Sequence, residues 1–79
     1  MENMIEYNSI EHLSTDIKLA SMAVGTRVIV KLTGDNLTVY REAKVTRIGP
    51  DHIQVVFKDK TWTVVFFKDI VGFPIGPPR

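Results

Sequence analysis

Few residues in this chain of 79 residues could do acid–base or nucleophilic chemistry. His12 and His52 lie far apart in the sequence, and neither has a carboxylate at a spacing typical of a catalytic pair. A carboxylate pair could be formed only by Asp59 with Asp69 or Asp35, and no hydrolase, metalloprotease or phosphate-loop motif accompanies these residues. Cysteine is absent, which excludes disulfides and thiolate metal sites. The sequence therefore predicts a protein that is not an enzyme and has no metal or cofactor.

Basic and aromatic residues are the remaining candidates for a binding site. The basic residues that fall on neighbouring predicted strands are Arg41, Lys44, Arg47, Lys58 and Lys60. Adjacent strands could gather these side chains into a patch for phosphate groups. Tyr40 and Trp62 lie among them and offer aromatic faces on which bases could stack. The sequence thus leaves two interpretations open, a nucleic-acid-binding surface and ordinary solubility charges.

Charge is unevenly spread along the chain, although the formal net charge is only +1. Residues 1–24 contain one Lys against four Asp or Glu, a net charge of −3, whereas residues 25–79 contain nine Lys or Arg against five Asp or Glu, a net charge of +4. The acidic arm could lie on the basic body or be solvated. No apolar run approaches the roughly 18 residues of a membrane span, and no signal peptide is apparent. Together with the absence of cysteine, this predicts an intracellular protein of the cytoplasm or nucleus, with no membrane partner.

The acidic arm has the periodicity of a helix. Residues 1–7 show no period and are expected to form a flexible end. Apolar residues then recur at steps of three and four, which predicts a helix that ends by residue 24, is capped by Asn8 or Ser9 and is followed by Gly25. The residues of its apolar face are Ile10, Leu13, Ile17, Ala20 and Val24. This face is expected to pack on the body or to dock a partner.

Residues 25–73 alternate between apolar and polar positions, which is typical of short strands. Five strands are expected, at residues 27–32, 38–48, 52–58, 61–67 and 70–73. Ile48 falls on the polar register of its strand, which predicts a β-bulge near Arg47. Residues 74–79 form a tail rich in Pro and Gly, which is expected to end all ladder pairing at Pro74. The pattern predicts an all-β protein, a five-stranded SH3-like barrel with a short N-terminal α-helix, although Sm-like and OB barrels also fit the strand count.

The predicted strand at residues 61–67 is apolar on both faces. Trp62, Val64 and Phe66 face one way, and Val65 and Phe67 face the other. A solvated sheet would not keep that pattern, so something is expected to cover the second face. The candidates are the N-terminal helix and another subunit, and in the second case Val65 and Phe67 would form the interface of a homo-oligomer.

Residues 24–75 resemble Tudor domains, small SH3-like barrels of the wider royal family. The resemblance lies in an alternating strand after Gly25, in the stretches VYREAKV at 39–45 and IQVVFKD at 53–59, and in the turn KDI at 68–70. It implies a non-catalytic module that docks a peptide or protein partner, which in that family can be methylated.

In Tudor domains the mouth of the barrel holds an aromatic cage with an acidic residue, which attracts a methylated ammonium group by cation–π interaction. By position, Phe57 and Asp59 match members of the cage. Tyr40 matches another member with a slip of one residue, and Trp62 lies beside a further cage position. The resemblance thus implies a ligand site at Tyr40, Phe57, Asp59 and Trp62.

Residues 30–35, VKLTGD, are similar to the first strand and turn of Sm- and Hfq-like barrels, which also begin with a helix. This second resemblance implies self-assembly through strand edges and binding of RNA by the basic residues. The alternative hypothesis is therefore a nucleic-acid-binding small barrel that acts as an oligomer.

Overall fold

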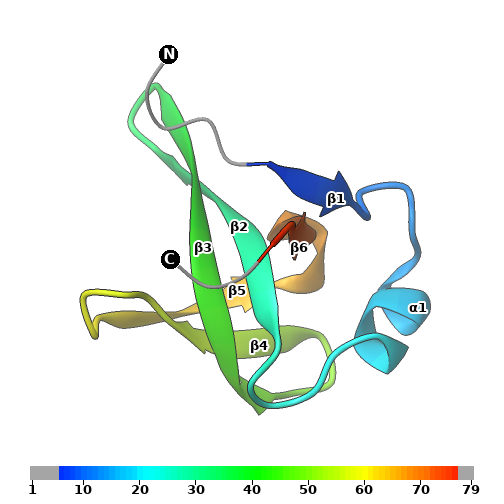
Figure 1. Cartoon of the computed structure of the whole chain (residues 1–79). Coiled ribbons are helices and arrows are strands. Elements are labelled where there is room, and N and C mark those ends of the chain that lie inside the picture. Colours follow the sequence, from blue (N-terminus) through cyan, green and yellow to red (C-terminus); the bar gives the residue numbers. More distant parts are fainter. Residues whose placement is uncertain (1–5, 77–79) are drawn as a thin grey trace.

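The computed structural model describes residues 6–76. In chain order its elements are β1 (Tyr7–Ser9), α1 (Thr15–Ala20), β2 (Arg27–Gly34), β3 (Leu37–Ile48), β4 (His52–Val56), β5 (Trp62–Phe66), the 3-10 helix η1 (Phe67–Asp69) and β6 (Ile70–Pro74). The strands form one antiparallel sheet in the order β1-β6-β2-β3-β4-β5 (Figure 1). The predicted mostly-β fold is confirmed. The sheet has six strands rather than five, and it is not closed, because β1 and β5 are its two edges.

The long strand β3 pairs with two neighbours over different parts of its length. Residues 37–44 pair with β2, and residues 44–48 pair with β4. A two-residue turn at Asp35 and Asn36 joins β2 to β3, and Asn36 adopts a φ of 56°, which asparagine tolerates better than most residues. Because β3 belongs to both pairings, it carries the sheet from one half of the molecule to the other (Figure 1).

A β-bulge interrupts the part of β3 that pairs with β4. The register with β4 shifts between Val45 and Arg47, which confirms the bulge that the position of Ile48 predicted. Thr46 is the extra residue, and its hydroxyl donates a hydrogen bond of 3.1 Å to the carbonyl oxygen of Gln54. As a result Val45 and Ile48 both pack in the core, although residues three positions apart in a regular strand point to opposite faces.

The core lies on the inner face of this sheet and takes residues from every strand between β2 and β6. Its fully buried members are Val28, Val30, Val45, Ile53, Val55 and Ile70. Val65 and Phe67 are 5% and 2% exposed and belong to the same core. The expectation of an oligomer interface through these two side chains is therefore wrong, because the chain itself covers them. Ile29 is also fully buried, so β2 is covered on both faces at this point, although its residues alternate between apolar and polar types at both ends.

The N-terminal arm begins with a strand instead of a helix, and residues 1–5 of the expected flexible end lie outside the described residues. β1 contains Asn8 and Ser9, the two expected helix caps, and pairs with β6 from Tyr7↔Pro74 to Ser9↔Gly72. Pro74 thus lies in the ladder, not beyond its end. A Cβ atom on Gly72 would overlap the ring of Tyr7 and come within 2.5 Å of the carbonyl oxygen of Asn8. Glycine at this position therefore allows β1 to lie against β6.

The helix α1 is shorter than predicted and presents a different face. Ser14 is its N-cap, and the Ser14 hydroxyl accepts a hydrogen bond of 3.4 Å from the backbone N–H of Ile17. Ile17 and Val24 were expected on the buried face, yet their side chains are exposed. Gly25 has the positive φ expected of it, 98°, but lies in the loop after the helix. No helix within residues 6–76 is long and apolar enough to cross a membrane.

Lys18 is a buried cation that joins α1 to η1. Its residue is 4% exposed, and its Nζ donates a hydrogen bond of 2.9 Å to the carbonyl oxygen of Phe67. Burial lowers the pKa of Lys18 below the ordinary lysine value of 10.5, while attraction to Glu11 and Asp69 opposes that shift. The protein therefore holds the helix in place through a charge that is partly removed from water.

We predict that replacing Lys18 by Met changes how stability depends on pH. Because the folded pKa is lowered, the unfolded chain binds more protons between that pKa and pH 10.5. The free energy of unfolding of the wild type should consequently rise, relative to that of Lys18→Met, as pH increases through this window. Urea unfolding of both proteins at a series of pH values between neutral and 10.5 measures the difference, in which the contributions of other groups cancel. Parallel pH curves would contradict the prediction.

Candidate functional site

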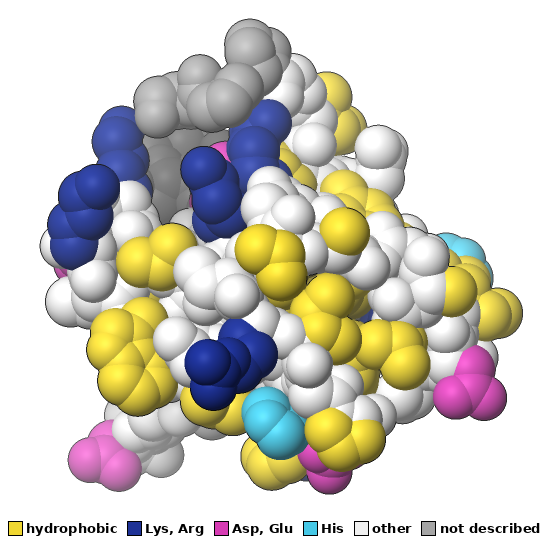
Figure 2. All heavy atoms as spheres, turned by 90° about the horizontal axis from the view of Figure 1, so that it is seen from below, with side chains coloured by type: hydrophobic (Ala, Val, Ile, Leu, Met, Phe, Trp, Pro, Cys, Tyr) yellow, Lys and Arg dark blue, Asp and Glu magenta, His cyan; other side chains and the backbone are white. Residues whose placement is uncertain are grey.

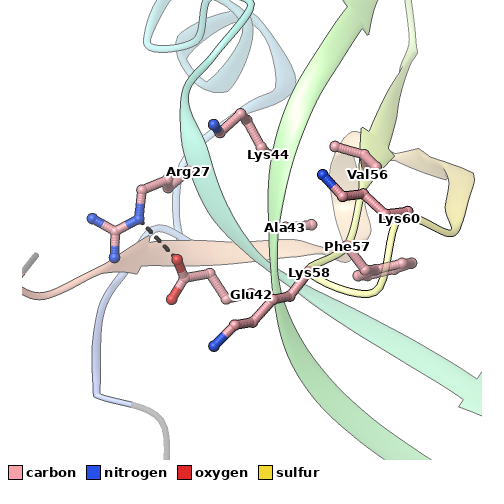
Figure 3. A pocket seen from close by; sticks show the side chains of 8 residues that line it. All are labelled: Arg27, Glu42, Ala43, Lys44, Val56, Phe57, Lys58 and Lys60. Atoms are coloured by element: carbon pink, nitrogen blue, oxygen red, sulfur yellow. Dashed lines mark hydrogen bonds and ion pairs between the residues drawn. The ribbon is translucent and has the colours of Figure 1, made fainter. Parts of the chain in front are cut away.

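A pocket of about 390 Å³ lies where β2, β3 and the turn between β4 and β5 meet (Figure 3). Its lining residues are Arg27, Glu42, Ala43, Lys44, Val56, Phe57, Lys58 and Lys60. Four of them are cations and one is an anion, which leaves three positive charges in excess. The other three are apolar, so the pocket combines an apolar lining with a cationic rim. Such a pocket fits an anion that also carries an apolar surface.

Sheet register places the pocket next to an exposed tryptophan. Arg27 pairs with Lys44, Lys44 with Val56, and Val56 with Trp62, so these four residues form one row across β2, β3, β4 and β5. Directly paired residues project their side chains to the same side of a sheet. Trp62 is 63% exposed and therefore stands at the end of the row that begins in the pocket.

The turn between β4 and β5 is held by a compact set of hydrogen bonds. Phe57 N–H donates to the Thr61 carbonyl at 2.8 Å, and Lys60 N–H donates to the Phe57 carbonyl at 3.0 Å. Asp59 Oδ1 accepts hydrogen bonds from the backbone N–H of Thr61, at 3.1 Å, and from the Thr61 hydroxyl. Lys60 has a φ of 76°, a left-handed conformation that costs a residue with a Cβ about 1–2 kcal/mol. The turn thus fixes the backbone of the lysines that line the pocket.

Ion pairing divides the cations of the pocket into two groups. Arg27 Nε lies 2.8 Å from Glu42 Oε2, so this carboxylate neutralises the arginine (Figure 3). Within residues 6–76, no carboxylate lies within ion-pair distance of Lys44, Lys58 or Lys60. These three lysines are the charges with which the pocket could bind an anion. The space-filling view also shows several Lys and Arg side chains gathered at the upper left of one face, and hydrophobic side chains scattered among polar ones below them (Figure 2).

The four residues expected to form an aromatic cage are divided between two environments. Phe57 is 6% exposed, and the guanidinium of Arg41 lies 4.1 Å from the centre of its ring. Asp59 Oδ2 lies 3.7 Å from the same guanidinium. Tyr40 and Trp62 are exposed and, by strand alternation, point to the side of the sheet opposite to Phe57. A cation of the protein itself thus occupies the aromatic face and the carboxylate that a methylated ligand would need.

Of the five basic residues predicted to bind nucleic acid, the structure brings Lys44, Lys58 and Lys60 together in the pocket. Arg41 is engaged with Phe57, and Arg47 lies further along β3, in register with Gln54. Arg27 and Glu42 line the pocket although the sequence did not predict them as site residues. Their positions could have been found by counting strand pairs outward from the two-residue turn between β2 and β3, because this count places Arg27 opposite Lys44.

His52 has a carboxylate partner in the adjacent residue, a spacing that is not typical of a catalytic pair. Its Nδ1 lies 2.8 Å from Oδ1 of the preceding residue, Asp51. Across residues 6–76, no group of three or more His, Cys, Asp or Glu residues is placed to hold a metal ion. The basic pocket is therefore the arrangement from which function can be argued.

Comparison with known proteins adds no relative to this description. The chain matches no protein-family model, no curated protein and no solved structure. The resemblances to Tudor and Sm-like barrels stay predictions, so the function must be inferred from the pocket and its surroundings.

The turn allows a direct test of its hydrogen bonds. The Thr61 hydroxyl, followed by the Thr61 backbone N–H, lowers the pKa of Asp59 below 3.8, and Arg41 lowers it further. We predict that Thr61→Val raises the pKa of Asp59 toward that value, because it removes the strongest donor. An NMR titration of the Asp59 carboxyl carbon measures the change. Thr38→Val is the matched control on β3, and an equal rise in both variants would contradict the assignment.

Proposed function

We propose that this protein is a non-catalytic module that binds single-stranded nucleic acid. In this proposal the three lysines of the basic pocket contact successive backbone phosphates, and a neighbouring base stacks on Trp62. The observation that carries the proposal is a set of three lysines, Lys44, Lys58 and Lys60, that have no carboxylate partner among residues 6–76 and share one pocket beside an exposed tryptophan. A basic groove with aromatic side chains along its path is the arrangement by which proteins bind single strands.

The two exposed aromatic residues flank the pocket, which favours a strand over an isolated anion. Trp62 ends the row that contains Lys44, and Tyr40 lies two residues from Glu42 on the same side of β3. A phosphate in the pocket would leave its neighbouring nucleotides within reach of either ring. A small inorganic anion would use the lysines but neither aromatic side chain.

Docking of a methylated peptide is the weaker proposal. It requires the ring of Phe57 and the carboxylate of Asp59, and both already contact Arg41. A methylated ammonium would have to displace this guanidinium before it could use the ring. Phosphate binding in the pocket needs no such displacement, because the three lysines have no competing carboxylate among residues 6–76.

An SH3-like barrel is our proposal for the finer class of the fold. Strands β2 to β6 are five consecutive antiparallel strands, and the last of them returns to pair with the first. This order supports a partly open barrel whose seam lies between β5 and β6, with the short helix η1 between them. We also propose that the protein works inside the cell, where single-stranded nucleic acid is found.

Removing two pocket lysines should weaken binding more than removing two lysines elsewhere. We expect Lys58→Gln with Lys60→Gln to lower the affinity for a fluorescent single-stranded oligonucleotide about tenfold at low salt. The control is Lys31→Gln with Lys68→Gln, which has the same net charge, lies outside the pocket and should change the affinity less than about twofold. Fluorescence anisotropy measures both.

The salt dependence gives a second readout of the same variants. Three lysine–phosphate contacts predict that log K falls with log salt at a slope of about −2, and the pocket variant should lose about one unit or more of that slope. A flat salt response, or an equal loss of affinity in the pocket variant and the control, would contradict the proposal.

Trp62 is the single tryptophan of the chain, so its fluorescence reports directly on stacking. We expect oligonucleotide binding to quench this fluorescence. Trp62→Ala should weaken binding by the roughly 1–3 kcal/mol of one base–aromatic stack, and Trp62→Phe should retain most of the affinity. Unchanged fluorescence on saturation, together with wild-type affinity of Trp62→Ala, would exclude Trp62 from the site and leave only the lysines.

A further inference from the structure

The strand β5 is an edge of the sheet with one free side. It pairs with β4, and no other strand of residues 6–76 pairs with it. Natural edge strands are commonly protected from pairing with other chains by charges, by proline or by a bulge. The chain has no charged residue and no proline between Lys60 and Lys68, and the pairing of β5 with β4 is regular throughout. This edge therefore lacks the usual protection.

The hydrogen-bond pattern identifies which backbone groups are free. Phe57 N–H donates to the Thr61 carbonyl at 2.8 Å, which marks this pair as one that exchanges hydrogen bonds. Such pairs alternate along an antiparallel ladder, so the hydrogen-bonding groups of Thr63 and Val65 also point toward β4. Those of the residues between them point away from the sheet, toward the free side. These residues are Trp62, Val64 and Phe66.

The same three residues have exposed apolar side chains. Trp62 is 63% exposed, Val64 is 48% exposed, and Phe66 is 52% exposed. The free edge thus offers unpaired backbone groups and apolar side chains from the same positions. An added strand with apolar and aromatic side chains on this face would form hydrogen bonds with these backbone groups and bury these side chains at the same time.

We propose that β5 pairs antiparallel with β5 of a second copy of this chain, about a two-fold axis at Val64. In this arrangement Val64 lies opposite Val64 of the partner subunit, and Trp62 lies opposite Phe66 of the partner subunit. Each of these three opposed positions exchanges two backbone hydrogen bonds, about six in total. The sheet then runs without interruption through both copies, and both basic pockets lie on one continuous surface.

A second copy fits this edge better than an unrelated strand because the segment is complementary to itself. The pattern Trp-x-Val-x-Phe reads antiparallel as Phe-x-Val-x-Trp, so each aromatic side chain meets another across the strands. The segment is bounded by Asp59 and Lys60 at one end and by Lys68 and Asp69 at the other. In the antiparallel arrangement, Asp59 and Lys60 of one chain lie near Lys68 and Asp69 of the other at each end of the contact. The two acidic and two basic residues add no net charge there.

Sedimentation of the full chain tests the proposal, and it needs no nucleic acid. The contact is small, so we expect a weak dimer in which the apparent mass rises from 8.9 kDa toward twice that value between micromolar and millimolar concentration. Val64→Lys should abolish the rise, because it places two like charges on the axis. Leu37→Lys is the control, since it adds the same charge at an exposed residue far along β3 and should leave the dimer intact.

A mixture of two variants tests the position of the axis. Val64→Asp alone should also be a monomer, but an equimolar mixture of Val64→Lys and Val64→Asp should regain the mass of a dimer, because opposite charges then meet across the two chains. Recovery also shows that both variants fold. A wild type that stays monomeric at millimolar concentration, a dimer that survives Val64→Lys, or a mixture that remains monomeric would each overturn the proposal.

Discussion

The two-sided pairing of β3 is the constraint on which the rest of the structure depends. A strand that pairs with β2 over one part and with β4 over the next must bend, and the bulge at Thr46, within the part paired with β4, contributes to this bend. Without the extra residue, Ile48 would point to solvent and the second half of the sheet would lose its inner face. The bulge therefore sets both which side chains form the core and how β4 and β5 are aimed.

The same register decides which surface groups meet. The row from Arg27 to Trp62 exists because the turn before β3 and the pairing of Lys44 with Val56 are both fixed. In and beside that row, the cation that has an ion-pair partner differs from the pocket lysines. Arg27 is neutralised by Glu42, and the pocket lysines have no carboxylate in reach among the described residues. The distribution of ion pairs, which cannot be read from the net charge of +1, thus determines where an anion would bind.

Local sequence signals predicted the strands and the bulge, because alternation and turn residues act over a few positions. They failed where contacts distant in sequence decide the outcome. β1 depends on β6 and on the space left by Gly72, neither of which is visible in residues 7–9. The amphipathic pattern of the arm placed Ile17 inside, whereas Lys18 is buried instead because a carbonyl oxygen 49 residues away accepts a hydrogen bond from its ammonium group. The packing of the whole fold decides which face of β5 is covered. From the sequence, Val65 and Phe67 were expected to form an exposed interface, whereas the exposed side chains are those of Trp62, Val64 and Phe66.

The helix α1 and the turn between β4 and β5 lie apart (Figure 1), and this separation affects which charges can meet. Glu11 precedes α1 and Asp16 lies in its first turn, and α1 lies on the opposite side of the molecule from the turn between β4 and β5 (Figure 1). Charges beyond about one Debye length, roughly 10 Å at 0.1 M salt, are largely screened from each other. Because α1 lies on the other side of the molecule from the turn that carries Lys58 and Lys60 (Figure 1), salt weakens the attraction between these two carboxylates and these two lysines. Glu11 acts on Lys18 instead, where its attraction helps to keep a buried lysine charged and α1 attached.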